Sequence, residues 1–158
     1  GEPFSVEVGF VKMPSYLLRD TMAVRKNANE LEYLQAALWA ERLDQSFRWT
    51  VAENLSALLP SDRVSVSAAG SGRALVKLSI AVEQFDVDTQ GRGTLIAQWR
   101  LTPLGMNQPV KNGQAHLSRA GPSPVANPEV IATTLSALTA QFSRALAQAL
   151  RQAAQPGP

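Results

Sequence analysis

Val76-Lys77-Leu78-Ser79-Ile80-Ala81-Val82 is the segment that decides the fold, because its large apolar side chains fall at every second position. That period of two predicts a β-strand with one buried face. Residues 86–93 follow with glycines and aspartates, which predict a hairpin loop into a second strand at residues 94–102. A turn at residues 105–113 and a shorter strand at residues 114–119 complete a predicted antiparallel meander.

Two other segments repeat their apolar residues every three or four positions and are predicted to be amphipathic helices. The first covers residues 39–59, with Pro60 directly after it, and its apolar stripe is Trp39, Leu43, Phe47, Val51, Leu55, Leu58 and Leu59. The second starts at Asn127-Pro128-Glu129, which supplies an N-cap, a proline at the first helical position and an acid in the first turn. Its stripe is Ile131, Leu135, Leu138, Phe142, Leu146 and Ala149.

The N-terminal part of the chain predicts further strands. Phe4, Val6, Val8 and Phe10 alternate with Ser5, Glu7 and Gly9, which indicates a strand that buries these four apolar side chains and ends before Pro14. Two short strands are expected at residues 21–25 and 31–34 around a turn at residues 26–29, and another at residues 63–67.

This order of strands, helix, strands and helix predicts an α+β domain. Its simplest form is a single mixed or mainly antiparallel sheet with two long amphipathic helices packed on one face. The length of 158 residues fits one domain, assigned to residues 1–154, and residues 155–158 are expected to form a disordered tail.

The composition excludes several classes of function. The chain holds 15 Lys and Arg and 13 Asp and Glu, scattered rather than gathered into the concentrated basic face that nucleic acid requires. One histidine and no cysteine cannot supply the common zinc ligand sets. No run of about 18 apolar residues indicates a membrane-spanning helix.

Residues with catalytic potential lack the context that a reaction requires. His116 is the only histidine, and no Gly-x-Ser-x-Gly motif accompanies it. Glu83 and Asp86 are the first pair of carboxylates to consider, but acids near a hairpin are expected to be solvated. The glycines at residues 70–72 and 91–93 lack the ending of a phosphate-binding loop. The sequence therefore predicts no catalytic, cofactor or metal site, and no enzyme.

Contacts with a partner protein are predicted at two places. Trp49 lies two residues past Phe47, off the apolar stripe of the first helix, and could anchor a partner. Residues 14–19 form a loop that presents Tyr16, Leu17 and Arg19 as a second contact. In the alternative interpretation, the aromatic side chain of this loop folds back over the core.

Four blocks resemble one known family. They are Pro14-x-Tyr16-Leu17-x-Arg19, Trp39-Ala40-Glu41-x-Leu43, Ala52-Glu53-Asn54-Leu55 with Leu58-Leu59, and Phe85-Asp86 followed by the strand with Trp99. The chain thereby resembles the PqiC-like ABC-type transport auxiliary lipoproteins. It departs from the family at Asp20 and Arg42, where members often carry proline.

The resemblance implies a periplasm-facing lipoprotein on the outer membrane that assists an MCE-domain protein and an ABC permease in phospholipid transport. It also implies a non-enzymatic adaptor, able to form a homo-oligomer and anchored through a lipidated N-terminal cysteine that the given sequence does not contain. A second hypothesis is a periplasmic protein that binds a lipid or another small apolar ligand between its helices and sheet.

Overall fold

The computed structural model describes residues 5–59, 64–66, 74–103, 110–123 and 127–154. The elements in order are β1 (Ser5–Lys12), η1 (Ser15–Leu17), β2 (Thr21–Asn27), β3 (Glu30–Leu38), α1 (Leu43–Leu58), β4 (Val64–Ser65), β5 (Ala74–Asp88), β6 (Gly93–Pro103), β7 (Lys111–Arg119) and α2 (Pro128–Ala154). The predictions for the tail at residues 155–158, for Phe4, for the glycines at 70–72 and for most of the turn at 105–113 fall outside the described residues.

The described strands form one mixed sheet organised around β5. Along one edge β5 pairs with antiparallel β6, which pairs with antiparallel β7, so the predicted meander is confirmed. Along the other edge β5 is long enough to pair in parallel with two strands in succession. Its first half pairs with β1 and its last two residues with β2, whereas β4 and β3 extend the sheet beyond them.

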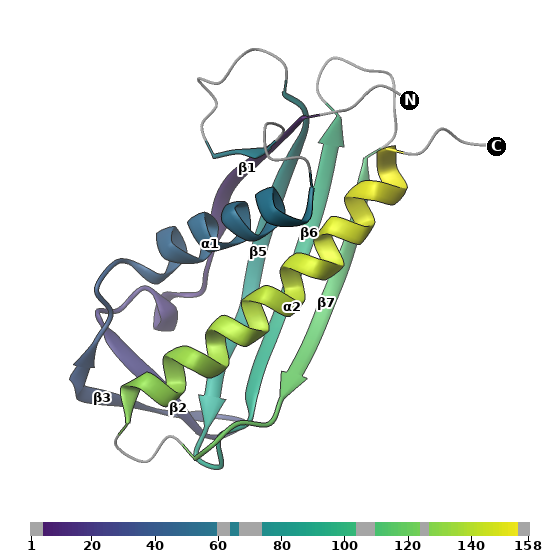
Figure 1. The fold of residues 1–158 in the computed structure, drawn as a ribbon. Coiled ribbons are helices and arrows are strands. Elements are labelled where there is room, and N and C mark those ends of the chain that lie inside the picture. Colours follow the sequence, from purple (N-terminus) through teal and green to yellow (C-terminus); the bar gives the residue numbers. More distant parts are fainter. Residues whose placement is uncertain (1–4, 60–63, 67–73, 104–109, 124–126, 155–158) are drawn as a thin grey trace.

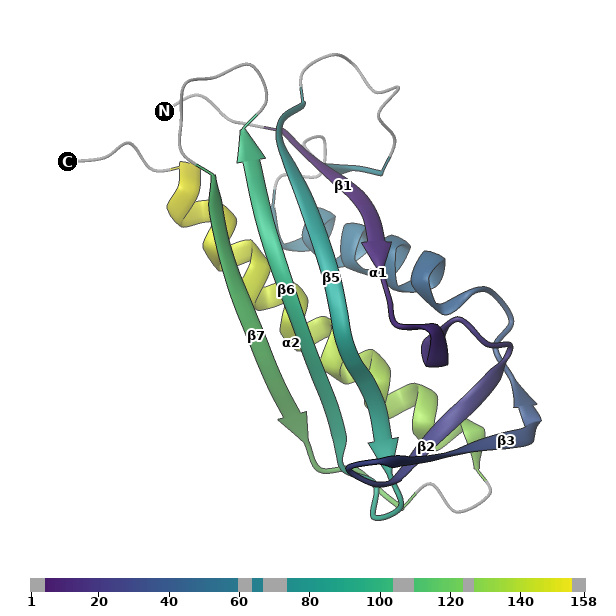
Figure 2. The ribbon, with the colours of Figure 1, turned by 180° about the vertical axis from the view of Figure 1, so that it is seen from behind.

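Both helices lie on the same face of this sheet (Figure 1). Seen from behind, α1 and α2 lie beyond the strands (Figure 2). The core fills the layer between helices and sheet, with fully buried side chains that include Val8, Val51, Leu55, Leu78, Leu95, Leu138 and Phe142. The predicted α+β class, with two amphipathic helices on one face, is confirmed.

Several predicted boundaries are wrong by a few residues. The first helix begins at Leu43 rather than Trp39, because the Trp39 N–H donates to the Asp20 carbonyl at 2.8 Å and holds this residue beside the start of β2. Strand β5 continues to Asp88, so the hairpin loop is shorter than predicted, and Gly91 takes its left-handed backbone with φ 94°. The last strand begins at Lys111 rather than residue 114.

A bulge in β1 overturns the predicted burial of Phe10. Val8 pairs with Leu78 and Val11 pairs with Ile80, so three steps along β1 match two along β5. The additional residue reverses the alternation of side chains between the two faces. As a result Val11 is buried, whereas Phe10 is 85% exposed.

Candidate partner-binding site

Phe10 and Trp49 lie at a groove of about 430 Å³ between the end of β1 and the start of α1, which is called the β1–α1 groove below. Its lining residues are Phe10, Val11, Arg42, Asp44, Gln45, Arg48 and Trp49. The bulge turns Phe10 outward, and the position of Trp49 off the buried stripe of α1 leaves it 55% exposed. Two large aromatic side chains from distant parts of the sequence are therefore available on one surface.

Arg48 connects α1 to the bulge. Its Nε and Nη2 atoms donate to the Val8 carbonyl oxygen at 3.1 and 3.0 Å, and Nη2 also donates to the Val66 carbonyl. The guanidinium carbon lies 4.6 Å from the centroid of the Phe10 ring, within range of a cation–π interaction. Arg48 thus orients the exposed ring while its own charge stays at the groove.

Arg42 and Asp44 form the other polar part of the groove. Arg42 donates from Nε to Oδ1 of Asp44 at 3.2 Å and from Nη2 to Oδ2 at 2.9 Å. Asp44 Oδ1 also accepts the Gln45 N–H at 2.9 Å, in the first turn of α1 where a negative charge is favourable. Two arginines against one aspartate give the lining a single positive charge in excess.

The three predicted contact residues of the 14–19 segment lie outside the β1–α1 groove, and they differ in how far they are exposed to solvent. Leu17 is only 5% exposed, so the prediction that it is presented to a partner is wrong. Tyr16 is half-buried and folds back over the core, as in the alternative interpretation. Arg19 is exposed, with its guanidinium carbon 4.0 Å from the centroid of the Tyr33 ring. None of the three lines the β1–α1 groove.

Tyr16 belongs to a polar cluster around Asp86. The Tyr16 hydroxyl donates to Asp86 Oδ2 at 2.8 Å and accepts the Phe85 N–H at 3.0 Å. Arg25 donates from Nε to the same oxygen, Oδ2, at 3.0 Å, and its Nη2 atom lies 2.9 Å from Oδ2. Gln84 Nε2 donates to the other carboxylate oxygen, Oδ1, at 3.2 Å. The cluster ties η1 and β2 to β5.

Asp86 is only 3% exposed, so the prediction that it is solvated is wrong. Because β5 extends to Asp88, into the predicted hairpin loop, Asp86 is a strand residue that faces Arg25 and Tyr16. Burial, followed by the Asp86 charge, raises the pKa of the Tyr16 hydroxyl, and the hydrogen bond to Asp86 raises the pKa of Arg25. Glu83 is exposed and accepts a hydrogen bond from Gln98 at 2.9 Å, so it does not form a shared site with Asp86.

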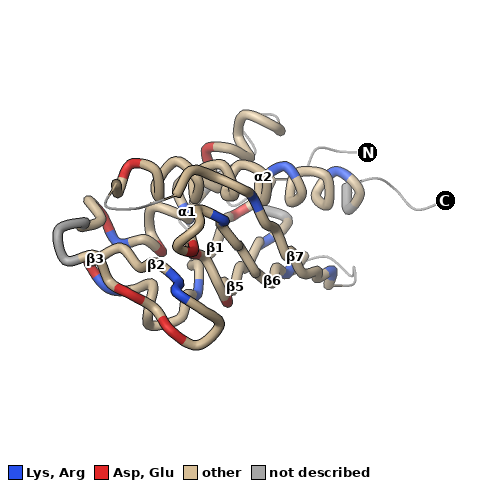
Figure 3. Tube along the Cα trace, turned by 90° about the horizontal axis from the view of Figure 1, so that it is seen from below, with Lys and Arg blue, Asp and Glu red and all other residues tan. Residues whose placement is uncertain are grey.

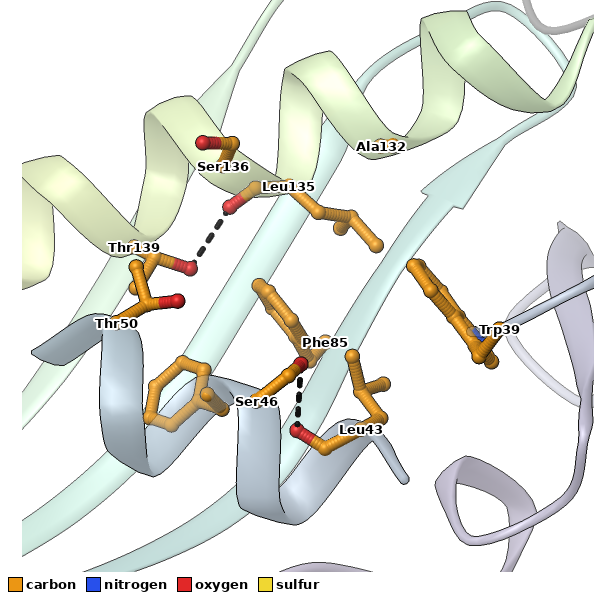
Figure 4. A pocket seen from close by; sticks show the side chains of 10 residues that line it. Trp39, Leu43, Ser46, Thr50, Phe85, Ala132, Leu135, Ser136 and Thr139 are labelled. Carbon is orange, nitrogen blue, oxygen red and sulfur yellow. Dashed lines mark hydrogen bonds between the residues drawn. The ribbon is translucent and has the colours of Figure 1, made fainter. Parts of the chain in front are cut away.

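A second hollow lies between the two helices and β5 (Figure 4). Its volume is about 120 Å³, below the roughly 300–1,000 Å³ typical of ligand pockets. Rings and aliphatic side chains line much of it, including Trp39, Phe47, Phe85 and Leu135. Two of its hydroxyls are engaged within the helices, since Ser46 donates to the Leu43 carbonyl and Thr139 to the Leu135 carbonyl.

The described residues offer little for catalysis or metal binding. No three His, Cys, Asp or Glu side chains among them gather closely enough to hold a metal ion. His116 is exposed on β7. None of the described helices combines the length and apolar character needed to cross a membrane.

Charge is distributed unevenly over the molecule (Figure 3). The charged residues of edge strand β3 are Glu30 and Glu32, and those of edge strand β7 are Lys111 and Arg119. The two strands lie at opposite ends of the path β3-β2-β5-β6-β7. Lys26 on the neighbouring strand β2 lies 3.8 Å from each of the two glutamates, so β3 carries acidic side chains that are partly neutralised, whereas β7 carries only basic ones.

Comparison with known proteins supports one family. The sequence model of the family described as "ABC-type transport auxiliary lipoprotein component" matches residues 1–154. No curated protein matches the chain. One crystal structure of an uncharacterized protein is 24% identical with a TM-score of 0.80, over 94% of this chain and 94% of that one. A Xanthomonas campestris protein is 19% identical with a TM-score of 0.73, over 91% and 81% of the two chains.

Proposed function

Because the chain belongs to the family of ABC-type transport auxiliary lipoprotein components, we propose that it is a non-enzymatic adaptor of an MCE-type phospholipid transport system. It acts on the periplasmic face of the outer membrane, to which a lipid group anchors the full-length protein. Its partners are an MCE-domain protein and, through that protein, the inner-membrane ABC permease. The adaptor helps to maintain the outer membrane and makes or breaks no covalent bond.

The observation that carries this proposal is the exposure of Phe10 and Trp49 at the β1–α1 groove. Aromatic residues and arginine are enriched in the centres of protein interfaces, where they contribute much of the binding energy. Here two aromatic rings and two arginines surround one hollow. In this proposal Trp49 is the principal residue that contacts the partner protein, and Phe10 contributes to the same surface. Arg19 contacts the partner at a second, separate place.

The polar cluster of Tyr16, Arg25 and Asp86 favours an adaptor over an enzyme. Catalytic carboxylates need a reacting group within hydrogen-bonding distance. Both oxygens of Asp86 already accept hydrogen bonds from side chains of the protein, and the carboxylate is buried. This cluster fits a structural role.

The small volume of the inner hollow and the charged lining of the larger β1–α1 groove favour an adaptor over a lipid carrier. A carrier needs a cavity that encloses most of its ligand. The hollow between helices and sheet holds about 120 Å³, and aromatic rings of the core surround it.

Self-association is supported by the acidic side chains of β3, which Lys26 neutralises only in part, and the basic side chains of β7. A contact between β3 of one copy and β7 of the next is heterologous, and such contacts close into rings when the rotation permits. It would bring Glu30 and Glu32 near Lys111 and Arg119. Sedimentation analysis should show smaller species for a Lys111→Glu, Arg119→Glu variant and for the unmodified protein in high salt. Equal size under all three conditions contradicts this arrangement.

Affinity purification of the full-length, lipidated protein tests the adaptor proposal. The wild-type protein should recover the MCE-domain protein, and the double variant Phe10→Ala, Trp49→Ala should recover much less although circular dichroism shows that it is folded. Leu38→Ala is a matched control, because Leu38 is 62% exposed on β3 and does not line the groove. Failure of the folded wild-type protein to recover any transport component would contradict the proposal.

A further inference from the structure

We infer that the β1–α1 groove binds an extended peptide segment of a partner protein, which pairs with the edge of β1 and carries an apolar side chain close to a carboxylate. The inference rests on the proposed adaptor function and specifies the chemistry of the partner. Three features of the groove carry it: a strand edge, a pair of aromatic rings and an excess of positive charge.

The edge of β1 is the first feature. On one side β1 pairs with β5 from Ser5 to Lys12. On the other side only Val6 and Glu7 pair with a described strand, the two-residue β4. At the next residue along β1, Arg48 donates a hydrogen bond to the Val8 carbonyl oxygen. No described strand pairs with this side of residues 9–12. Figure 2 shows this part of β1 at the margin of the sheet, with α1 behind it.

An edge strand beside a helix is a common receptor for an extended peptide, which adds to the sheet as a further strand. The exposed N–H and C=O groups of the edge supply affinity, and side chains at every second position of the peptide enter pockets beside the strand. In this protein α1 supplies Gln45, Arg48 and Trp49 as the wall of the groove, and Phe10 projects from the strand itself. The two rings suit an apolar side chain of the peptide.

The positive charge of the groove specifies a second side chain of the bound peptide, a carboxylate. Arg42 is already paired with Asp44 through two hydrogen bonds. Arg48 has hydrogen bonds to backbone carbonyls, and no described carboxylate lies within ion-pair distance of it. A carboxylate on the occupant, from an acidic residue or a chain terminus, would balance this positive charge.

A lipid surface could also attract aromatic and basic residues. A lipid surface offers no strand to pair with this side of residues 9–12, whereas an extended peptide does. The residues also surround a hollow instead of forming a convex tip. These two observations favour a peptide.

Site-specific photo-crosslinking in cells tests the inference. The photoreactive amino acid benzoylphenylalanine replaces Gln45 or Trp49 in the full-length, lipidated protein, and His116 on β7 in a control. Mass spectrometry should identify adducts from positions 45 and 49 with one short segment of a transport component that contains an apolar and an acidic residue. Arg42→Glu should lower the yield from position 45 about tenfold, since it places like charges together. Replacing the identified carboxylate by lysine should restore the yield in that variant.

Other adducts overturn the inference. Crosslinks at 45 and 49 only to phospholipid show a membrane contact, and crosslinks only to the same chain show self-association. Crosslinks to a transport component from position 116 but not from 45 or 49 exclude this groove while the adaptor function stands. Recovery of no transport component from any position contradicts both.

Discussion

Tyr16 illustrates how one hydroxyl group connects elements that are far apart in the sequence. It donates to Asp86 and accepts the N–H of Phe85, 70 and 69 residues away. Removing it by Tyr16→Phe leaves a buried carboxylate with one donor fewer and a backbone N–H without its acceptor. We expect the free energy of unfolding, measured by urea denaturation, to fall by about 1–3 kcal/mol.

Tyr33→Phe is the matched control, because it keeps the ring that Arg19 contacts and removes a hydroxyl that has no hydrogen bond to the described residues. Its effect should stay below about 0.5 kcal/mol, as for most surface substitutions. Equal losses in the two variants would show that the Asp86 cluster does not stabilise the fold.

The raised pKa of Tyr16 predicts how stability depends on pH. In the unfolded chain this hydroxyl ionises near its ordinary pKa of about 10, and in the folded protein only at higher pH. The stability linked to this difference is complete below about pH 10 and is lost as the pH rises toward the folded value. The gap in unfolding free energy between wild type and Tyr16→Phe should therefore narrow between about pH 8 and pH 11. Urea denaturation at both pH values measures it, and a constant gap would contradict the role assigned to the hydroxyl.

The cluster around Asp86 also shows where prediction from sequence ends. Tyr16 and Phe85-Asp86 were recognised as parts of two separate blocks, but no local pattern indicates that they touch. Arg25 reaches Asp86 across 61 residues because β2 pairs in parallel with the end of β5. That pairing follows from the topology of the sheet, which periodicity does not determine.

Strand β1 shows how far alternation in the sequence predicts the buried face of a whole strand. Alternation predicted its buried face correctly at Val6 and Val8 and wrongly at Phe10, because the bulge adds one residue opposite β5. Gly9 was the available signal, since a glycine inside a strand often marks a bulge. The bulge also exposes Phe10 to solvent. The residue whose burial was predicted wrongly therefore lines the same groove as Trp49, the contact residue that the sequence did predict.

Two substitutions test the register of β1. Val11→Ser should lower the free energy of unfolding by about 2 kcal/mol or more, because it replaces a buried apolar side chain by a hydroxyl. Phe10→Ser should cost at most about 1 kcal/mol, which corresponds to its cation–π contact with Arg48. Urea denaturation of both variants measures the difference. Strict alternation predicts the reverse order, so a larger loss for Phe10→Ser would disprove the bulge.

The helices were predicted more completely than the strands. Asn127 caps α2 as expected, since its side-chain oxygen accepts the Glu129 N–H at 3.1 Å. The buried stripes follow the predicted positions from Leu43 to Leu55 in α1 and from Ile131 to Leu146 in α2, but Leu150 rather than Ala149 is buried near the end of α2. Trp39 is the exception, because it matched the stripe by spacing but lies before the helix and packs on the core from the end of β3.

Considered as a whole, the molecule consists of a sheet with two helices closely packed on one face, and this arrangement determines what it can carry. Four apolar side chains, Phe47, Val51, Leu55 and Phe142, fill the space between α1, α2 and the sheet and are at most 2% exposed. The Phe47 ring lies 5.3 Å from that of Phe85 and 6.0 Å from that of Phe142, between centroids. An acyl chain could enter this layer only by displacing these rings, which would open the core.

We therefore expect the protein to contain no phospholipid when it is purified under non-denaturing conditions without its lipid anchor. Native mass spectrometry should give the mass of the polypeptide alone, and organic extraction should yield no stoichiometric phospholipid. A Phe47→Ala variant is the informative comparison, because removing the ring enlarges the hollow beside it, and apolar cavities of this kind bind small apolar molecules. Its mass spectrum should show added benzene where wild type shows none. One bound phospholipid per wild-type chain would contradict the packing argument and favour a lipid carrier over an adaptor.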